Sequence, residues 1–405
     1  MPSSGASGPV GDGGRVVVVG AGMAGTRTCQ ELRARGYPGE LVLLGAEPHP
    51  PYDRPPLSKA FLLAAPGHTD LALDPQWYAG ADWRPGVTAT GLRPGVLDTT
   101  DGELGWDALV LATGAAPARL AGTGGGPGGR VLRTLDDAER LRDGLTPGAR
   151  VVVVGAGWIG AEVTTAARRR GCEVTVLEAG DAPLVVPLGS AVGGHTAAWY
   201  AQAGATLRCG TPVSTVDGDG VTLAGGERLA ADVVVEAVGV RRELDWLSGS
   251  GVQVDHGVLT DASCRTSLAG VVAVGDCAAR WSPRAGRRFR LEHWDDALNA
   301  PGVAARVLLG DRAAVYDPVP YVWSEQFGRY LQWVGWRDGE PRVWRADPAA
   351  RAGWAAAWLD PDGRLTGFLA VDRPRDLLQA RRVIAEGRAV DPDRLADPAI
   401  PVKEA

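Results

Sequence analysis

The chain has 405 residues, of which 45% are hydrophobic and 22% charged, and its formal net charge is −6 at pH 7. A chain of this length divides into two or three domains, each with a core of its own. The acidic balance and the lack of a dense Lys/Arg run exclude a nucleic-acid-binding protein. No apolar stretch reaches the ~18 residues that cross a bilayer, so we expect no membrane association.

The N-terminus lacks the charged and apolar regions of a signal peptide. We expect residues 1–14 to form a flexible lead. The five cysteines are scattered, with no Cys-x-x-Cys and no close pair, and the five histidines show no metal-ligand spacing. We therefore expect no metal site and no redox disulfide. Buried, unpaired cysteines are typical of a reducing compartment, which favours a cytoplasmic protein.

The first structured segment predicts a dinucleotide-binding fold. β-Branched residues at 16–19 predict a strand, a helical pattern follows to about Arg35, and an apolar run at 41–44 predicts a second strand. The strand-to-helix junction carries the triplet Gly20, Gly22 and Gly25. In such a triplet the first glycine allows a tight turn, the second lets the backbone approach a pyrophosphate, and the third allows close packing.

The same device repeats about 130 residues further on. Strands are predicted at 151–154 and 174–177, with a helix to about Arg170 between them. This junction carries Gly155, Gly157 and Gly160. Glu178 ends the second strand, where a carboxylate accepts hydrogen bonds from a ribose 2′-hydroxyl and repels a 2′-phosphate, which favours NAD(H) over NADP(H). The alternative is a solvated glutamate at a strand end.

After Val315 the pattern changes to short alternating segments rich in tryptophan. The turn pairs Asp338-Gly339 and Asp362-Gly363 predict hairpins, and a helix is expected around 376–385. We therefore predict an α/β protein with two Rossmann-like domains and a C-terminal α+β domain.

Seven motifs occur in the order seen in one family: GAGMAG, PPYDRPPLSK, LATGA, GAGWIGAE, AVGDCA, RLEHWDDA and VWSEQF. On these the chain resembles the ferredoxin reductase family, which includes putidaredoxin and rubredoxin reductases and, more distantly, apoptosis-inducing factor. The resemblance implies a glutathione-reductase-like architecture. It assigns residues 15–115 and 244–316 to a discontinuous FAD-binding domain, 116–243 to an NAD-binding domain and 317–405 to the C-terminal domain.

The resemblance also implies cofactor contacts, with FAD bound non-covalently. Around the pyrophosphate and ribose it places Gly20, Gly22, Met23, Ala24, Gly25, Glu47, Arg54 and Lys59. Near the adenine and along the ribityl chain it places Val87, Ala112, Thr113, Gly114, Arg133, Gly275 and Asp276. Around the isoalloxazine it places Glu292, His293, Trp294 and Trp323. The NAD(H) contacts would be Gly155, Gly157, Trp158, Ile159, Gly160, Glu178, Val238 and Gly239.

Three residues are candidates for a catalytic role. In similar enzymes the glutamate matching Glu162 pairs with the lysine matching Lys59 beside the flavin, where the ammonium would stabilise negative charge on the reduced ring. The alternative is a purely structural salt bridge. Trp158 is expected either to cover the flavin until nicotinamide displaces it or to pack in a core.

The segment Pro56–Lys59 lies where disulfide-type relatives carry reactive cysteines, so electrons must leave FAD directly. Our leading hypothesis is an NADH-dependent ferredoxin reductase that passes electrons through FAD to a small acidic iron-sulfur ferredoxin serving a cytochrome P450 or dioxygenase. Basic residues that could attract this partner are Arg287, Arg288, Arg290 and Arg329, with ordinary solvated charges as the alternative. Two other hypotheses are a flavoenzyme acting directly on a small organic substrate in a biosynthetic pathway, and a redox-dependent binding protein like apoptosis-inducing factor.

Overall fold

The computed structural model describes residues 10–65, 71–120, 128–348 and 353–405. The chain divides into two compact units. Unit 1 comprises Met1–Asp53, Leu71–Ala116 and Arg241–Pro318. Unit 2 comprises Arg54–Asp70, Pro117–Val240 and Val319–Ala405. Two of the five segments that link the units pair as short strands, β8 (Ala116–Pro117) and β16 (Val240–Arg241).

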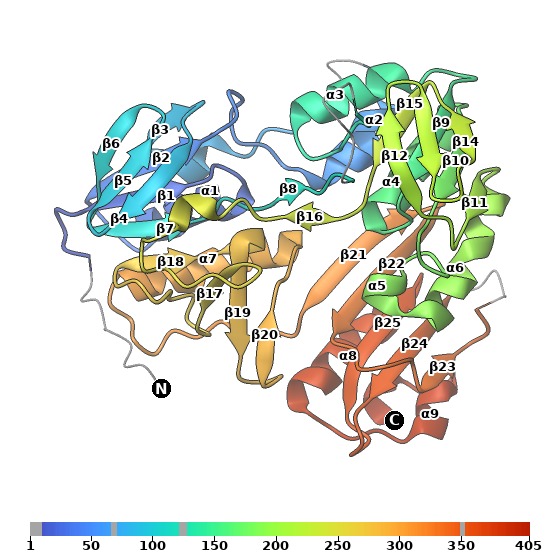
Figure 1. The fold of residues 1–405 in the computed structure, drawn as a ribbon. Helices are drawn as coiled ribbons and strands as arrows, with labels where there is room; N and C mark the ends of the chain where they lie inside the picture. The colour runs from blue at the N-terminus through green and yellow to red at the C-terminus, as the bar shows by residue number, and fades with distance from the viewer. Residues whose placement is uncertain (1–9, 66–70, 121–127, 349–352) are drawn as a thin grey trace. The chain divides into compact units, whose positions relative to one another are not determined.

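Unit 1 is built on a five-stranded parallel sheet in the order β18-β7-β1-β2-β3 (Figure 1). Its strands are β1 (Arg15–Val19), β2 (Glu40–Gly45), β3 (Asp82–Pro85), β7 (Ala108–Leu111) and β18 (Val271–Ala273). The central strands are unbroken runs of buried valine and leucine because both faces of the sheet are covered.

One face of this sheet is covered by two helices that pack on each other, α1 (Met23–Ala34) and α7 (Trp294–Leu308). The other face is covered by the antiparallel meander β4 (Ala89–Arg93), β5 (Val96–Thr99) and β6 (Gly102–Gly105). The remaining elements of unit 1 are β17 (Val258–Thr260), β19 (Ala278–Ser282), β20 (Arg287–Phe289), η2 (Pro75–Tyr78), η3 (Asp245–Leu247) and η4 (Gly275–Cys277).

The N-terminal lead was expected to be flexible over residues 1–14. Residues 1–9 lie outside the described residues. Within the rest, the Val10 amide donates to the Leu308 carbonyl and the Tyr37 hydroxyl donates to the Gly14 carbonyl. Val10 also packs against the helix-covered core, so this end of the lead is attached to unit 1.

Unit 2 contains a second parallel sheet in the order β11-β10-β9-β15 (Figure 1). Its strands are β9 (Arg150–Val154), β10 (Glu173–Leu177), β11 (Thr206–Arg208) and β15 (Val233–Glu236). The helices α3 (Leu135–Gly144) and α4 (Trp158–Arg169) contribute to the core on one face. The meander β12 (Val213–Asp217), β13 (Gly220–Leu223) and β14 (Arg228–Ala230) packs on the other.

The segment η1 (Pro55–Ser58) and α2 (Ala60–Leu63) belongs to unit 2, although it follows the first dinucleotide fold in the sequence. The reason is packing: Leu62 is fully buried in the core formed by α3, α4 and the second sheet. This placement brings Ser58 and Lys59 to α4.

The C-terminal part of unit 2 is a five-stranded antiparallel sheet in the order β21-β22-β25-β24-β23. Its strands are β21 (Tyr321–Gln326), β22 (Arg329–Gly335), β23 (Val343–Arg345), β24 (Trp354–Leu359) and β25 (Leu365–Val371). One face packs on α8 (Pro374–Glu386), with α9 (Pro392–Ala396) and η5 (Val402–Glu404) nearby in the chain. The other face packs on α5 (Val185–Leu188) and α6 (Ser190–Gln202).

The predicted fold class is therefore confirmed: two parallel Rossmann-like sheets and an antiparallel sheet with a covering helix. The hairpin predicted at Asp362-Gly363 is confirmed, because this turn joins the paired strands β24 and β25. The hairpin predicted at Asp338-Gly339 is wrong. The strand before it, β22, is already paired on both edges, so the chain continues to β23 at the far edge of the sheet.

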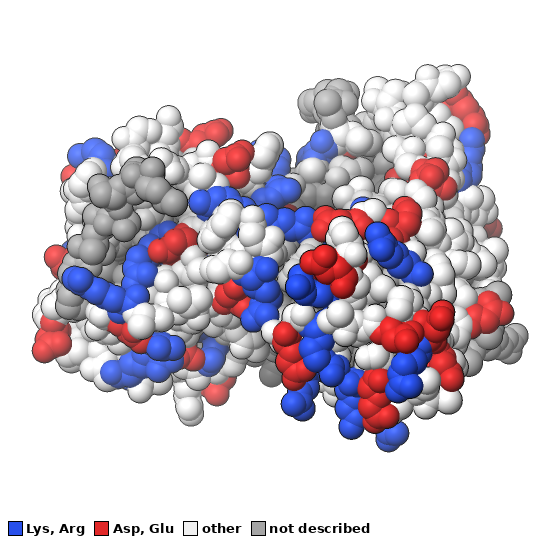
Figure 2. All heavy atoms as spheres, turned by 90° about the horizontal axis from the view of Figure 1, so that it is seen from below, with Lys and Arg blue, Asp and Glu red and all other residues white. Residues whose placement is uncertain are grey.

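Acidic and basic side chains are interspersed over the C-terminal part on the face drawn in Figure 2. Several form ion pairs with each other, among them Arg364 with Asp362 and Arg382 with Glu386. Such mixing leaves no broad single-sign surface among the described residues of the C-terminal part on this face.

The most buried ion pair of the C-terminal domain joins Arg345 and Asp376, at 2.9 Å. Arg345 is 2% exposed and also donates to the carbonyls of Leu395 and Ile400, so it ties α8 to the C-terminal segment. Arg345→Met should lower the free energy of unfolding by about 3–5 kcal/mol, because it leaves a buried carboxylate and several carbonyls without this donor. Denaturant unfolding followed by tryptophan fluorescence measures this. The control Arg364→Met, at an exposed pair, should cost less than about 1 kcal/mol.

Candidate functional site

The first glycine turn lies at the junction of β1 and α1 in unit 1. Gly20 has φ +111°, and a Cβ there would lie 2.2 Å from the Ala112 carbonyl oxygen. A Cβ on Gly25 would lie 1.8 Å from the Gly20 carbonyl oxygen, so strand and helix approach too closely for any side chain. A Cβ on Gly22 would meet nothing within 4 Å. The turn thus has two glycines required by packing and one that faces open space.

This open space fits the pyrophosphate of a dinucleotide. Helix α1 begins without a capping side chain and without an acidic residue in its first turn. The amides of a helix N-terminus attract negative charge, and a missing Cβ lets a ligand approach the backbone. Met23 and Ala24 form the first residues of this helix.

Most of the other predicted FAD contacts also lie in unit 1. Thr113 and Gly114 follow β7, and Gly275 and Asp276 follow β18, so they share the carboxyl edge of the sheet with the glycine turn. The contacts in unit 1 are Gly20, Gly22, Met23, Ala24, Gly25, Glu47, Val87, Ala112, Thr113, Gly114, Gly275, Asp276, Glu292, His293 and Trp294. Those in unit 2 are Arg54, Lys59, Arg133 and Trp323.

Several unit 1 contacts are held by specific bonds. The Tyr52 hydroxyl donates to Glu47 at 2.5 Å, and the Val87 amide donates to the Gly45 carbonyl at 2.9 Å. The Trp294 indole donates to Asp53 at 3.0 Å, and His293 caps the N-terminus of α7. These bonds fix groups that come from distant parts of the sequence.

Arg242 was missed by the sequence analysis. Its buried guanidinium donates to the Asp276 carbonyl at 3.1 Å and to the Glu292 carboxylate. It therefore links two predicted FAD contacts. No motif marks it, because its partners are 34 and 50 residues away.

In unit 2, Arg54 and Arg133 are brought together although they are 79 residues apart. The Arg54 guanidinium donates to the Arg133 carbonyl at 2.6 Å. The Arg133 amide in turn donates to Asp137 at 3.2 Å, in the first turn of α3. The segment after the first dinucleotide fold is thus tied to the start of α3.

The second glycine turn repeats the geometry of the first. Gly155 has φ +100°, and a Cβ there would lie 2.4 Å from the Ala237 carbonyl oxygen. A Cβ on Gly160 would lie 2.0 Å from the Gly155 carbonyl oxygen, whereas one on Gly157 would meet nothing within 4 Å. Ile159 is exposed in the first turn of α4, and Val238 and Gly239 follow the neighbouring strand β15.

Glu178 lies against this second turn. Its carboxylate accepts from the Ala156 amide at 2.8 Å and from the Gly180 amide at 2.7 Å. These bonds disfavour the alternative of a solvated strand-end glutamate. They hold a negative charge where the adenosine ribose of a dinucleotide would lie in this fold.

Lys59 and Glu162 form a largely buried ion pair in unit 2. The ammonium lies 2.7 Å from the carboxylate, and the side chains are 18% and 4% exposed. The Lys59 ammonium also donates to the Pro55 carbonyl at 3.2 Å and lies 4.9 Å from the centre of the Trp323 ring. Two candidate catalytic residues and a predicted flavin neighbour are thus in one cluster.

The second oxygen of Glu162 is bound by a residue that the sequence analysis did not assign. The Ser324 hydroxyl donates to it at 2.5 Å, and the Gln326 amide donates to Ser324 at 3.0 Å. Ser58 also donates to the carboxylate. Ser324 and Gln326 are buried on β21 and belong to VWSEQF, so the motif was noted but these side chains were not given a role.

Trp158 lies at the first position of α4 and packs partly against the tryptophan-rich core that includes Leu184 and Trp333. Both predicted roles for Trp158 remain predictions.

All five cysteines are free, and none is placed to act as a thiolate. Burial raises the pKa of Cys29 and Cys264 to about 12 and that of Cys277 to about 11. Burial also raises the pKa of Cys172 and Cys209. Thiols with raised pKa values stay protonated and make poor nucleophiles near neutral pH.

Across the described ranges, no three or more His, Cys, Asp or Glu side chains are grouped so as to hold a metal ion. Among the described helices, none is long and apolar enough to cross a membrane.

Two open dinucleotide turns and a buried Lys–Glu pair define an oxidoreductase that uses dinucleotide cofactors. A family model described as pyridine nucleotide-disulphide oxidoreductase matches residues 14–300, and one described as reductase C-terminal matches residues 321–405. The chain belongs to the pyridine nucleotide-disulphide oxidoreductase family and carries the reductase C-terminal domain.

Full-length relatives agree with this assignment. The chain is 37% identical to the chlorobenzene dioxygenase ferredoxin reductase component of Cupriavidus sp. (strain PS12), over 94% of this chain and 95% of the relative. It superimposes on the crystal structure of Fdr9 with a TM-score of 0.90 and 51% identity, covering 96% and 99% of the two chains. The covalent putidaredoxin reductase–putidaredoxin complex gives a TM-score of 0.90 and 32% identity, covering 96% and 97%. The resemblance to ferredoxin reductases is confirmed.

The glycine turn of unit 1 predicts different effects for substitutions at Gly25 and at Gly22. Gly25→Ala should destabilise unit 1 by about 3 kcal/mol, because its Cβ overlaps a backbone oxygen. Gly22→Ala should leave the melting temperature of the flavin-free protein unchanged, because its Cβ meets no protein atom within 4 Å, and should reduce the flavin retained after gel filtration, because the Cβ occupies the open space. Calorimetry and the ratio of flavin to protein absorbance test both. Full flavin content in Gly22→Ala would mean that the pyrophosphate does not lie there.

Proposed function

We propose that the protein is an NADH-dependent ferredoxin reductase. It passes electrons from NADH, through a non-covalently bound FAD, to an iron-sulfur ferredoxin that serves a cytochrome P450 or a dioxygenase. The observation that carries the proposal is the Lys59–Glu162 pair beside Trp323. Glu162 lies on α4, the helix that begins at the second glycine turn.

FAD suits this role because a bound flavin accepts two electrons together as a hydride and returns them singly. The open space at Gly22 supports FAD in the first turn, and that at Gly157 supports NAD(H) in the second. Glu178 would accept hydrogen bonds from the ribose hydroxyls and repel a 2′-phosphate.

The residues around Lys59 would stabilise the negative charge that the isoalloxazine gains when it is reduced. Trp323 offers an aromatic face, and the Lys59 ammonium, only partly exposed, stabilises negative charge in its neighbourhood. Glu162 keeps this lysine in place, and Ser324 keeps Glu162 in place through the other carboxylate oxygen. The alternative of a purely structural salt bridge predicts no effect on reduction beyond stability.

The five cysteines support direct electron exit. None forms a disulfide, and burial raises the pKa of each thiol. The acceptor class follows from relatives whose names describe ferredoxin reductase components of dioxygenase systems. A solved relative is linked to putidaredoxin.

Basic residues on β20 support an acidic partner. Arg287, Arg288 and Arg290 follow one another on or just after this strand of unit 1, and Trp281 on the paired strand is 40% exposed. Arg329, also named in the sequence analysis, belongs to unit 2.

The proposal is tested by anaerobic steady-state assays with an acidic [2Fe–2S] ferredoxin and cytochrome c. We expect NADH-dependent cytochrome c reduction that requires the ferredoxin and slows as salt screens the charges over a Debye length of about 8–10 Å. NADH oxidation that needs an organic compound and ignores ferredoxin would favour the small-substrate enzyme. Slow reduction with a long-lived charge-transfer complex and a changed oligomeric state would favour the binding protein.

The choice of nicotinamide cofactor gives a second test. NADH should be preferred over NADPH by about 5- to 150-fold in kcat/KM, since like charges at Glu178 and a 2′-phosphate cost on the order of 1–3 kcal/mol. Glu178→Arg should shift the preference toward NADPH. The matched control is Glu173→Arg, at the exposed opposite end of β10, which should leave it unchanged. Equal efficiency of the unaltered protein with both cofactors would contradict the assignment.

A further inference from the structure

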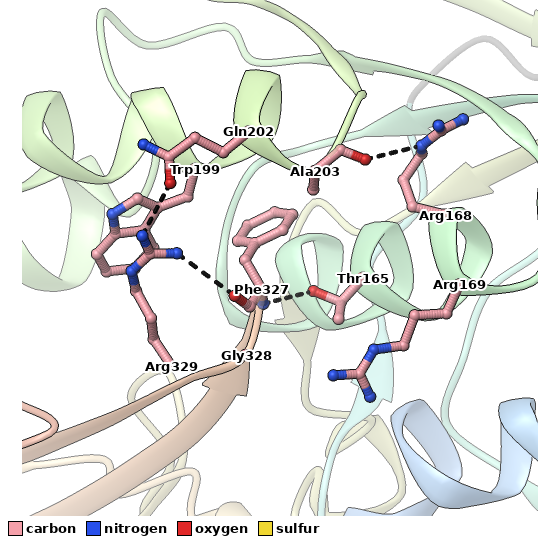
Figure 3. A pocket seen from close by; sticks show the side chains of 9 residues that line it. All are labelled: Thr165, Arg168, Arg169, Trp199, Gln202, Ala203, Phe327, Gly328 and Arg329. Carbon is pink, nitrogen blue, oxygen red and sulfur yellow. Dashed lines mark hydrogen bonds between the residues drawn. The ribbon is translucent and has the colours of Figure 1, made fainter. Parts of the chain in front are cut away.

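Unit 2 contains a hollow of about 400 Å³ that the proposed reaction does not use (Figure 3). It is formed by the last turn of α4, the C-terminal end of α6 and the tight turn between β21 and β22. Figure 3 shows Phe327 in the middle of this group, with arginines on either side. The volume is in the range of small-molecule sites, about 300–1,000 Å³.

The lining is strongly cationic. It includes Arg168, Arg169 and Arg329, and none of its nine residues is acidic. Three guanidinium groups line one hollow of a chain whose net charge is −6, and the positive potential that they produce there favours an anion.

Two of the arginines are held in place. The Arg329 guanidinium donates to the Gln202 side chain at 2.8 Å and lies 4.7 Å from the centre of the Trp199 ring. Arg168 donates to the Ala203 carbonyl at 3.0 Å and to the Cys172 carbonyl. Groups fixed before a ligand arrives lose little freedom when it binds.

Arg169 differs from these two. Its side chain is exposed, and within the described ranges it has no hydrogen bond or ion pair. Its five N–H donors are therefore available to a ligand. Guanidinium groups match the geometry of carboxylate and phosphate oxygens, often with two parallel bonds.

Two hydrogen bonds between α4 and the β21–β22 hairpin connect the hollow with the Lys59–Glu162 cluster. Glu162 binds Ser324, and three residues further along both elements the Thr165 hydroxyl accepts from the Phe327 amide at 2.9 Å. A ligand in the hollow would contact Thr165 and Phe327 directly. Its binding would thus act on the elements that hold Glu162.

We propose that this hollow binds a small organic or inorganic polyanion, bearing carboxylate or phosphate groups, and that its occupancy alters hydride transfer at the Lys59–Glu162 site. The binding is independent of the proposed function, whereas the effect on hydride transfer rests on it.

Binding is measured by calorimetry on the flavin-loaded protein with excess NAD⁺, using citrate as the polycarboxylate and inorganic phosphate as the phosphate probe. We expect at least one of them to bind at a single site, more weakly at high salt. Arg169→Gln should weaken binding about tenfold, the effect of losing one charge-assisted hydrogen bond. The control Arg375→Gln removes another exposed helical arginine of unit 2 and should change nothing. Equal affinity in the parent and Arg169→Gln, or no binding of either probe, would overturn the site.

The coupling is measured by stopped-flow reduction with NADH at saturating anion. A change in the reduction rate that disappears in Arg169→Gln supports it, and an unchanged rate in the parent overturns it. A protein that binds the anion but is not reduced by NADH would instead contradict the proposed function. The two failures are therefore distinguishable.

Discussion

The organisation of unit 2 depends on one buried ion pair, Lys59 with Glu162. Removing either partner from such a pair typically costs about 3–5 kcal/mol, because the other charge is left buried. The structure offsets the burial of Glu162 with donors from two other segments: Ser58 beside the lysine and Ser324 on β21. Two stretches of chain must therefore pack on α4: the 54–63 segment and β21, the first strand of the C-terminal sheet. Together with the burial of Leu62, these contacts explain why the segment after the first dinucleotide fold belongs to unit 2.

The same cluster explains how this chain could work without a thiol. Disulfide-type members of a two-dinucleotide architecture need a cysteine beside the flavin, and here Ser58 and Lys59 occupy the corresponding segment. The serine hydroxyl and the ammonium both bind Glu162, so the segment that could have carried a redox centre instead orders a carboxylate. Trp323 immediately precedes Ser324 on β21, and the Lys59 ammonium lies over its aromatic ring.

Local patterns predicted the two glycine turns, since spacing along the chain determines which glycines meet the neighbouring strand. Lys59 and Glu162 are 103 residues apart, and only the resemblance to a family joined them. Ser324 and Gln326 escaped prediction because a polar residue inside a motif does not reveal its partner. Arg242 escaped it because no motif marks this residue and its partners are 34 and 50 residues away. The hairpin at Asp338-Gly339 failed for a related reason: a turn pair describes a bend, whereas strand order is decided by which edges are already paired. The arginine-lined hollow depends on residues 160 positions apart, Arg169 and Arg329, and has no local signature.

We propose that the Lys59 ammonium promotes flavin reduction by stabilising charge that appears during hydride transfer. Anaerobic stopped-flow reduction of Lys59→Ala by NADH tests it most directly, with a variant carrying Cys→Ser at all five cysteines as the control. We expect Lys59→Ala to retain its flavin and to be reduced about 10²–10³-fold more slowly, the effect of losing one such donor. The cysteine-free protein should be reduced at the normal rate. Normal reduction of Lys59→Ala, together with a stalled cysteine-free protein, would contradict this role of Lys59 and would mean that a thiol relay carries the electrons.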